Sequence, residues 1–88
     1  MECRILSCER IVFSGEATAV YARSHEGWFG ILPGHAPAVF ALAPAPLRVT
    51  TPEGTRSFRV AGGTLYVEPE RVIILTADAS PTSEGPPR

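Results

Sequence analysis

The sequence predicts an all-β protein, folded as a sandwich or a barrel. Short runs of β-branched, aromatic and alternating residues are separated by glycine or proline every eight to twelve positions. No stretch shows the 3.6-residue apolar period of an amphipathic helix. The third observation is a strong hairpin signal at Thr51-Pro52-Glu53-Gly54, between two alternating segments.

Three strands are expected before the first long loop. Residues 4–8 begin the first strand, residues 11–13 form the second, and residues 16–23 form the third. The dipeptide Ser14-Gly15 is the predicted turn between the last two, because glycine and serine favour tight turns.

The second half of the chain supplies further strands. Residues 48–60 form a predicted hairpin, in which apolar and polar residues alternate on both arms. Leu65 and Val67 repeat the alternation after Gly62-Gly63, and the continuous apolar run 72–75 is typical of a fully buried strand.

Prolines mark the region between the third strand and the hairpin. Pro33, Pro37, Pro44 and Pro46 remove backbone donors at short intervals, which predicts edge strands and fixed loops. The tail has no apolar residue to bury, so the prediction is one domain over residues 1–80 and a disordered, proline-rich tail over 81–88.

The predicted core alternates along these strands. Burying each of its side chains contributes roughly 1.5–3 kcal/mol. Its members are Ile5, Val12, Phe29, Ile31, Phe58, Val60, Leu65, Val67, Ile73 and Leu75.

Size and charge exclude several classes of function. Eighty-eight residues fit one small domain, and a net charge of −1 with eight dispersed arginines gives no basic stripe for nucleic acid. The chain has no lysine, which excludes a P-loop and a Schiff-base enzyme. The N-terminus lacks signal-peptide features and no apolar run reaches the length of a membrane span, so a cytoplasmic location is expected.

The two cysteines are expected to be reduced structural thiols. If the segment between Cys3 and Cys8 is extended, their Cα atoms lie about 16 Å apart, beyond disulfide reach. His25 and His35 complete no zinc-ligand spacing, so no metal or cofactor is expected.

The octapeptide Gly30-Ile31-Leu32-Pro33-Gly34-His35-Ala36-Pro37 is the most distinctive segment. By itself it predicts only a rigid surface bend, because two prolines fix φ and Gly34 permits a positive φ. Together with Ala61-Gly62-Gly63 and Ala77-Asp78-Ala79, it resembles the N-terminal domain of the F-type ATP synthase epsilon subunit, called delta in mitochondria. The resemblance covers residues 3–79 and implies a flattened antiparallel β-sandwich.

The resemblance also implies a function. A member of this family is a non-catalytic rotor-stalk subunit that docks on the gamma subunit and on the membrane rotor ring of c subunits, and so couples proton or sodium translocation to ATP synthesis. The implied location is the cytoplasmic face of the bacterial inner membrane, as a peripheral protein. Family members commonly continue into a regulatory helical hairpin, whereas Pro81, Pro86 and Pro87 predict no helix start here. We therefore expect neither ATP binding nor inhibition by helix extension.

Four residues are candidate interface residues: Glu26, Trp28, Pro33 and His35. Trp28 stands where the family usually has a polar residue. If Phe29 and Ile31 point into the core, strand alternation directs Trp28 outward, either as an anchor at the rotor interface or as a surface aromatic lying over its neighbours.

Catalysis is the weakest interpretation of the sequence. His35 has no accompanying nucleophile or carboxylate, and His25-Glu26 is not the zinc-helix motif because position 29 is phenylalanine. Glu68 and Glu70 flank Pro69 in a predicted solvated turn. The alternative to the stalk subunit is a free-standing β-sandwich module that binds a peptide or an oligosaccharide.

Overall fold

The computed structural model describes residues 1–85, and the fold over this range is entirely β. No helix among these residues is long and apolar enough to cross a membrane. Eight strands occur: β1 (Glu2–Leu6), β2 (Ile11–Glu16), β3 (Ala19–Ser24), β4 (Gly27–Ile31), β5 (Ala38–Thr51), β6 (Gly54–Glu68), β7 (Arg71–Leu75) and β8 (Ala79–Pro81).

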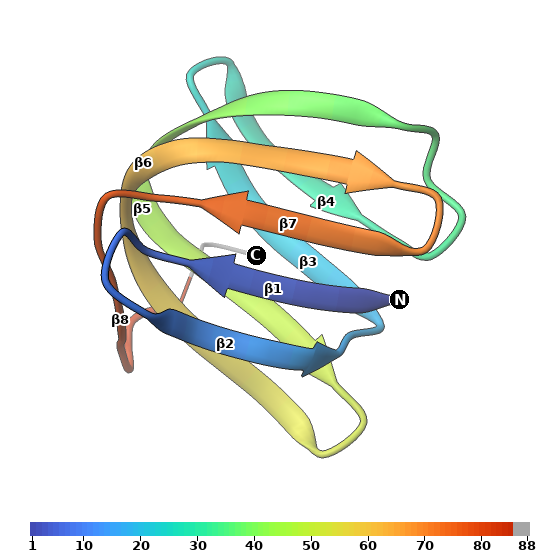
Figure 1. Ribbon diagram of the computed structural model, residues 1–88, viewed down its shortest axis with the longest axis horizontal. Helices are drawn as coiled ribbons and strands as arrows, with labels where there is room; N and C mark the ends of the chain where they lie inside the picture. Colours follow the sequence, from blue (N-terminus) through green and yellow to red (C-terminus); the bar gives the residue numbers. More distant parts are fainter. Residues whose placement is uncertain (86–88) are drawn as a thin grey trace.

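The strands form one sheet that folds over into two layers (Figure 1). The order is β2-β1-β7-β6-β5-β3-β4, and β8 pairs with β6 on the same edge as β7, at a different part of its length. The long strands β5 and β6 belong to both layers, because β6 pairs with β7 over residues 64–68 and with β8 over residues 58–60. The first layer consists of β2, β1, β7, the end of β6 that pairs with β7, and the part of β5 opposite that end. The second layer consists of β8, the other half of β6 with the part of β5 opposite it, β3 and β4.

Gly62 and Gly63 lie in β6 between the two layers. Both have positive φ, of 94° and 118°, which other residues rarely adopt. A Cβ on Gly63 would lie 2.0 Å from the carbonyl oxygen of Leu75, so β7 passes directly against this backbone. The glycine pair therefore allows β6 to continue from one layer into the other, instead of ending one strand and starting another.

The N-terminal strands differ from the prediction in one turn. Ser14 and Gly15 lie inside β2, paired with Arg4 and Cys3, and the predicted turn there is wrong. The chain turns instead at Ala17 and Thr18, whose amide groups donate to Met1 O and Thr50 O, each at 2.8 Å. The sequence did not indicate that β2 continues through Gly15, because glycine has no side chain and so interrupts the alternating pattern by which a strand is recognised.

One strand pairing is parallel. The remaining six pairings among the described residues are antiparallel, but β1 lies parallel to β7, with Glu2 opposite Arg71 and Leu6 opposite Leu75. The all-β, single-domain prediction is confirmed, and the parallel pair is an addition to it.

The prolines of β5 lie at a bulge rather than at an edge. Ser24 pairs with Leu42 and Tyr21 with Arg48, so residues 43–47 of β5 lie opposite only residues 22 and 23 of β3. Pro44 and Pro46 fall in this excess length, where no N–H is needed for the pairing with β3. The prediction of edge strands holds only locally in β5, whose residues 38–41 pair with β6 alone although β5 lies inside the strand order. Pro33 and Pro37 lie in the loop before it.

The core fills the space between the layers. Six predicted members, Ile5, Ile31, Phe58, Val60, Leu65 and Val67, are buried. Val12 and Phe29 are half-buried and pack against this core. The prediction is wrong for Ile73 and Leu75: Val72 and Ile74 are the buried residues of β7, and Leu75 is 43% exposed.

The tail is described only as far as Gly85. Pro81 ends β8, Thr82 N donates to Ser57 O at 3.0 Å, and Glu84 forms an ion pair with Arg59. Residues 86–88 lie outside the described range, and disorder of the segment 81–88 stays a prediction.

Candidate docking interface

An apolar surface covers the outward side of the first layer. The pairing places two rows of side chains on it: Val39, Tyr66, Ile73 and Arg4 in one row, and Ala41, Thr64, Leu75, Leu6 and Ile11 in the next. We call the apolar members of these rows the apolar face: Leu6, Ile11, Val39, Ala41, Tyr66, Ile73 and Leu75.

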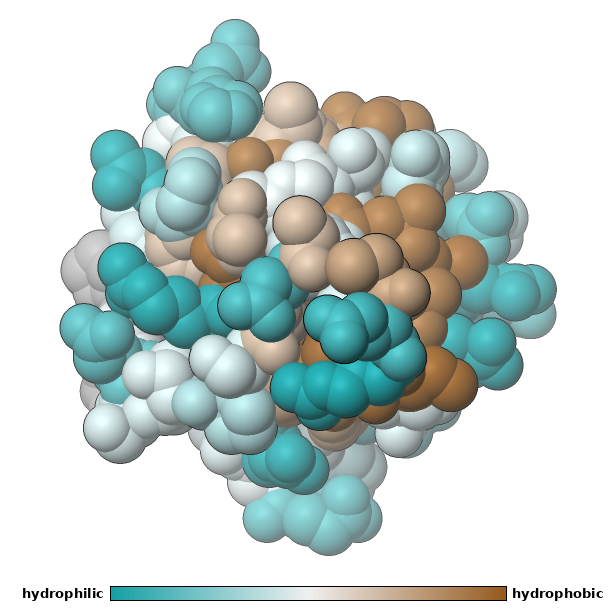
Figure 2. Space-filling model, turned by 60° about the vertical axis from the view of Figure 1, so that its left-hand side comes forward, coloured by the Kyte–Doolittle hydropathy of each residue, from teal (hydrophilic) through white to brown (hydrophobic). Residues whose placement is uncertain are grey.

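The apolar face is unusually exposed for a small soluble domain. Val39 is 65% and Ile11 64% exposed, and with Leu75 they are three of the four large apolar residues most open to solvent. Figure 2 shows apolar side chains gathered on the right of that view, with hydrophilic ones around them. Contiguous apolar surface of this kind marks sites where another molecule packs.

Charged pairs stand at the border of this face. Arg4 Nε lies 2.5 Å from Glu2 Oε2, and Arg71 Nε lies 3.0 Å from Glu68 Oε1. All four side chains are substantially exposed, so the pairs contribute little to stability. An apolar centre with a charged rim is the usual composition of a protein–protein interface.

The four candidate interface residues predicted from the sequence do not form one site. Glu26 and Trp28 lie at the β3–β4 turn and the start of β4, whereas Pro33 and His35 lie beyond its other end. Glu26, Pro33 and His35 are exposed. The length of β4 therefore separates two pairs of residues, each at its own end of the strand.

The loop after β4 is held by its own backbone. His35 N donates to Leu32 O at 3.1 Å, and His35 Nδ1 lies 2.6 Å from Ala36 O. The His35 ring meets Phe40 edge-on, with 6.4 Å between ring centroids. These contacts fix an exposed bend and give His35 no nucleophile or carboxylate partner.

Trp28 lies on the outward side of the second layer, in the direction that strand alternation predicts. Its ring is half-buried rather than freely exposed, because it stacks on Tyr21 with centroids 5.7 Å apart and planes 9° apart. Phe29, on the opposite side of β4, stacks on Phe40 at 4.1 Å and packs against the core.

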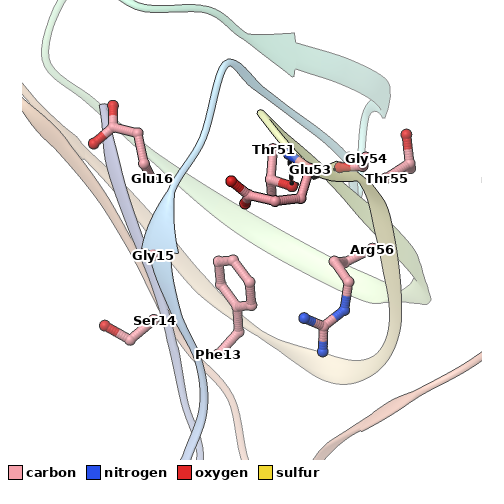
Figure 3. Close-up of a pocket in the computed structure, with 9 residues that line it drawn as sticks. All are labelled: Phe13, Ser14, Gly15, Glu16, Thr51, Glu53, Gly54, Thr55 and Arg56. Atoms are coloured by element: carbon pink, nitrogen blue, oxygen red, sulfur yellow. Dashed lines mark hydrogen bonds between the residues drawn. The ribbon is translucent and has the colours of Figure 1, made fainter.

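A hollow of about 390 Å³ lies between β2 and the β5–β6 hairpin (Figure 3). Phe13 and Arg56 point toward each other across it, while Ser14 and Glu16 point away. The Arg56 guanidinium carbon lies 5.6 Å from the Phe13 ring and 5.5 Å from the Phe58 ring. Arg56 therefore covers the open edge of the core.

Polar groups in the lining of the hollow are engaged in the hairpin turn. The lining includes no histidine or cysteine. The Thr51 hydroxyl donates to Gly54 O at 2.7 Å and accepts from Glu53 N, which fixes the hairpin turn. Among residues 1–85, no three histidine, cysteine or acidic groups lie together as metal ligands would.

Comparison with known proteins identifies the family. The model of the ATP synthase delta/epsilon chain β-sandwich domain matches residues 1–82, which is nearly the whole chain. This protein belongs to the ATP synthase delta/epsilon family.

Relatives in this family agree with the assignment. The ATP synthase epsilon chains of Psychrobacter cryohalolentis, Acinetobacter baylyi and Stenotrophomonas maltophilia are 39%, 41% and 42% identical over 80 residues, or 90% of this chain. The chain spans 58% of the first two relatives and 57% of the third. It thus corresponds to somewhat more than half of the length of each.

Solved structures show the same fold. A chain in the mitochondrial ATP synthase of Euglena gracilis, solved with OSCP, F1 and c-ring, has a TM-score of 0.84 and 29% identity, over 90% of this chain and 51% of its own length. A chain from the central stalk and c-ring of the Tetrahymena thermophila mitochondrial enzyme has a TM-score of 0.76 at 16% identity, over 90% of this chain and 64% of its own length. At 16% identity, the similarity to the Tetrahymena chain shows only that the two chains share a fold.

The apolar face of this delta/epsilon family member escaped the sequence analysis. Val39, Tyr66 and Leu75 each follow the period-2 alternation of their strand, which predicts a core position for Leu75 and does not distinguish Val39 and Tyr66 from other strand residues. The one sequence feature that could have indicated this face is the apolar run at 72–75. When both sides of a strand are apolar, one side can pack into the core and the other against a partner protein.

The two thiols differ sharply in environment. Cys3 is fully buried, and this burial, with a smaller contribution from Glu2, raises its pKa from 9.0 to about 12. Cys8 is exposed, with Sγ 3.5 Å from Ala77 O. The raised pKa keeps Cys3 a neutral thiol at physiological pH.

We expect a thiol reagent to distinguish the two cysteines. At pH 8 a chromogenic disulfide should label Cys8 within minutes, and Cys3 only as fast as the protein unfolds, because the thiolate is the reactive form. Above pH 9 stability should fall, since the unfolded Cys3 loses its proton while the folded one, with a pKa near 12, keeps it. Counting labelled thiols with and without denaturant checks this, and rapid labelling of both native thiols would contradict it.

Proposed function

We propose that the protein is a non-catalytic central-stalk subunit of an F-type ATP synthase. It docks on the gamma subunit and on the ring of c subunits, and so links proton or sodium translocation to ATP synthesis. In a bacterium it lies on the cytoplasmic face of the inner membrane as a peripheral protein. Family membership and the structural likeness to a chain of the Euglena enzyme support this proposal.

The apolar face is the observation that carries the proposal. It lies on the outward face of the sheet, and its middle strands β1, β7 and β6 are each paired on both sides, so a partner would pack onto it without rearranging those pairings. We assign it to the gamma subunit rather than to the polar loops of the c subunits, because a permanent contact has an apolar core.

The ring contact is assigned to the candidate residues at the two ends of β4. Glu26 and Trp28 at one end, and Pro33 and His35 at the other, remain proposed contacts for the polar loops of the c subunits. The Pro33–His35 bend suits such a role, because its backbone hydrogen bond and prolines leave little freedom to be lost on docking.

Charging Val39, the most exposed large apolar residue of the apolar face, should abolish docking. We expect Val39→Arg to lower retention of the protein on the assembled gamma and catalytic subunits by tenfold or more, because an unpaired charge would be buried in the contact. Val39 is 65% exposed, so the isolated variant should fold normally. Retention is measured by affinity purification of the complex.

The matched control is Thr55→Arg, which adds the same charge at an exposed position on the second layer. It should leave retention unchanged. Equal retention of the parent and Val39→Arg would sink the gamma assignment. Absence of the parent protein from the complex would instead favour a free-standing binding module.

A further inference from the structure

Four side chains form a continuous column on the outward side of the second layer. Arg23 lies over the Trp28 ring at 5.7 Å, Trp28 stacks on Tyr21, and Arg48 lies over the Tyr21 ring at 5.3 Å. The order is arginine, tryptophan, tyrosine, arginine, drawn from β3, β4 and β5. We call this column the arginine–aromatic ladder.

The ladder holds positive charge that the described residues leave unpaired. The ion pairs found within residues 1–85 involve Arg4, Arg59 and Arg71 but neither Arg23 nor Arg48. The strand pairing determines which residues of β3, β4 and the adjoining halves of β5 and β6 point to the same side as the ladder. None of these residues is acidic. Glu84 reaches the same side from the tail, where it pairs with Arg59.

The position of each guanidinium group beside an aromatic ring also bears on how it can bind. A guanidinium lying over an aromatic ring keeps its edge N–H donors free, and this fork matches the two oxygens of a carboxylate. The ladder thus offers two carboxylate-binding positions, separated by an aromatic surface on which an apolar or proline side chain can lie.

We propose that the ladder binds an acidic, extended segment of a partner polypeptide. Two arginines on a chain of net charge −1 give no track for a phosphate backbone, so the charge pattern favours carboxylates over nucleic acid. This deepens the rotor interface proposed for Trp28, because it specifies the chemistry of the partner segment there.

The single tryptophan gives a direct test. Trp28 is the only tryptophan, so titrating the isolated protein with hexaglutamate should change its fluorescence saturably at peptide concentrations below about 1 mM at low salt. Higher salt should weaken the binding, since the contact is between charges at the protein surface, where Arg23 is exposed and Arg48 half-buried. Arg23→Gln and Arg48→Gln should each weaken it about fivefold.

Arg71→Gln is the matched control. It removes the same charge from an exposed position on the first layer and should leave the affinity unchanged. Circular dichroism and the denaturation midpoint confirm that each variant folds. An absence of any saturable change, or equal weakening by Arg71→Gln, would overturn the proposal.

Two further arms complete the experiment. Hexalysine should give no response, and an oligothymidylate that binds as well as hexaglutamate would overturn the assignment to a polypeptide. Because Val39 and the ladder lie on different layers, a failed peptide titration and a failed retention assay reject different proposals.

Discussion

Replacing Gly63 by alanine is expected to cost about 4 kcal/mol or more of the free energy of unfolding, a large share of the 5–15 kcal/mol typical of a domain. Two independent causes act together. The φ of 118° is strained for any side chain, and the new Cβ would lie 2.0 Å from Leu75 O and 2.9 Å from Thr76 Cα. These atoms belong to the backbone of the chain just after β7 and its last residue, so relief requires β6 and β7 to separate.

Gly54→Ala is the matched comparison for this effect. Gly54 has a φ of 135° but would place its Cβ in open space, so this variant measures backbone strain alone, about 1–3 kcal/mol. Urea denaturation followed by Trp28 fluorescence gives both values. If Gly63→Ala is no less stable than Gly54→Ala, the close approach of β6 and β7 has no energetic importance.

Phe58→Ala should destabilise the protein by about 3–5 kcal/mol, which lowers the melting temperature by more than about 12 °C in a domain of this size. Phe58 is fully buried, contacts Phe13 with ring centroids 5.7 Å apart, and lies beneath Arg56. Its removal leaves a cavity between the layers and takes away support from both neighbours. Thermal unfolding monitored by circular dichroism checks the value.

Phe58→Leu provides the graded control. It retains most of the apolar volume and should cost clearly less than alanine. A loss below about 1.5 kcal/mol for Phe58→Ala would mean that Phe13 and Arg56 close over the vacated space.

The sequence was informative where alternation and turn chemistry agree. The Thr51–Gly54 hairpin and the inward direction of Phe58, Val60, Leu65 and Val67 follow from period-2 patterning beside a two-residue turn, and the structure confirms them. Alternation likewise predicts that the Trp28 side chain points outward, because the Ile31 side chain, three residues further along β4, points into the core.

The sequence pattern did not predict which residues are buried where the same pattern fits two arrangements. Val72–Leu75 is apolar on both sides, and only the pairing with β1 and β6 decides that Val72 and Ile74 point inward. Glycine caused the other errors: Gly15 continues a strand, and Gly62-Gly63 bend one, although glycine in sequence more often signals a turn.

The surfaces proposed as interfaces could be predicted only in part from the sequence, and the four candidate residues stay a prediction. Glu26, Trp28, Pro33 and His35 came from a local motif, whereas the apolar face and the ladder are each assembled from three or more strands. Such surfaces depend on the register between distant segments, which a single sequence does not contain.

The parallel pairing of β1 with β7 also sets the order of events during synthesis. Glu2 leaves the ribosome early, but its partner Arg71 follows only after nearly seventy more residues, a delay of several seconds at about 5–20 residues per second. Until then the β1–β2 hairpin has one unpaired edge and an uncovered apolar side. The first layer is therefore completed late in synthesis, when β7 inserts between β1 and β6.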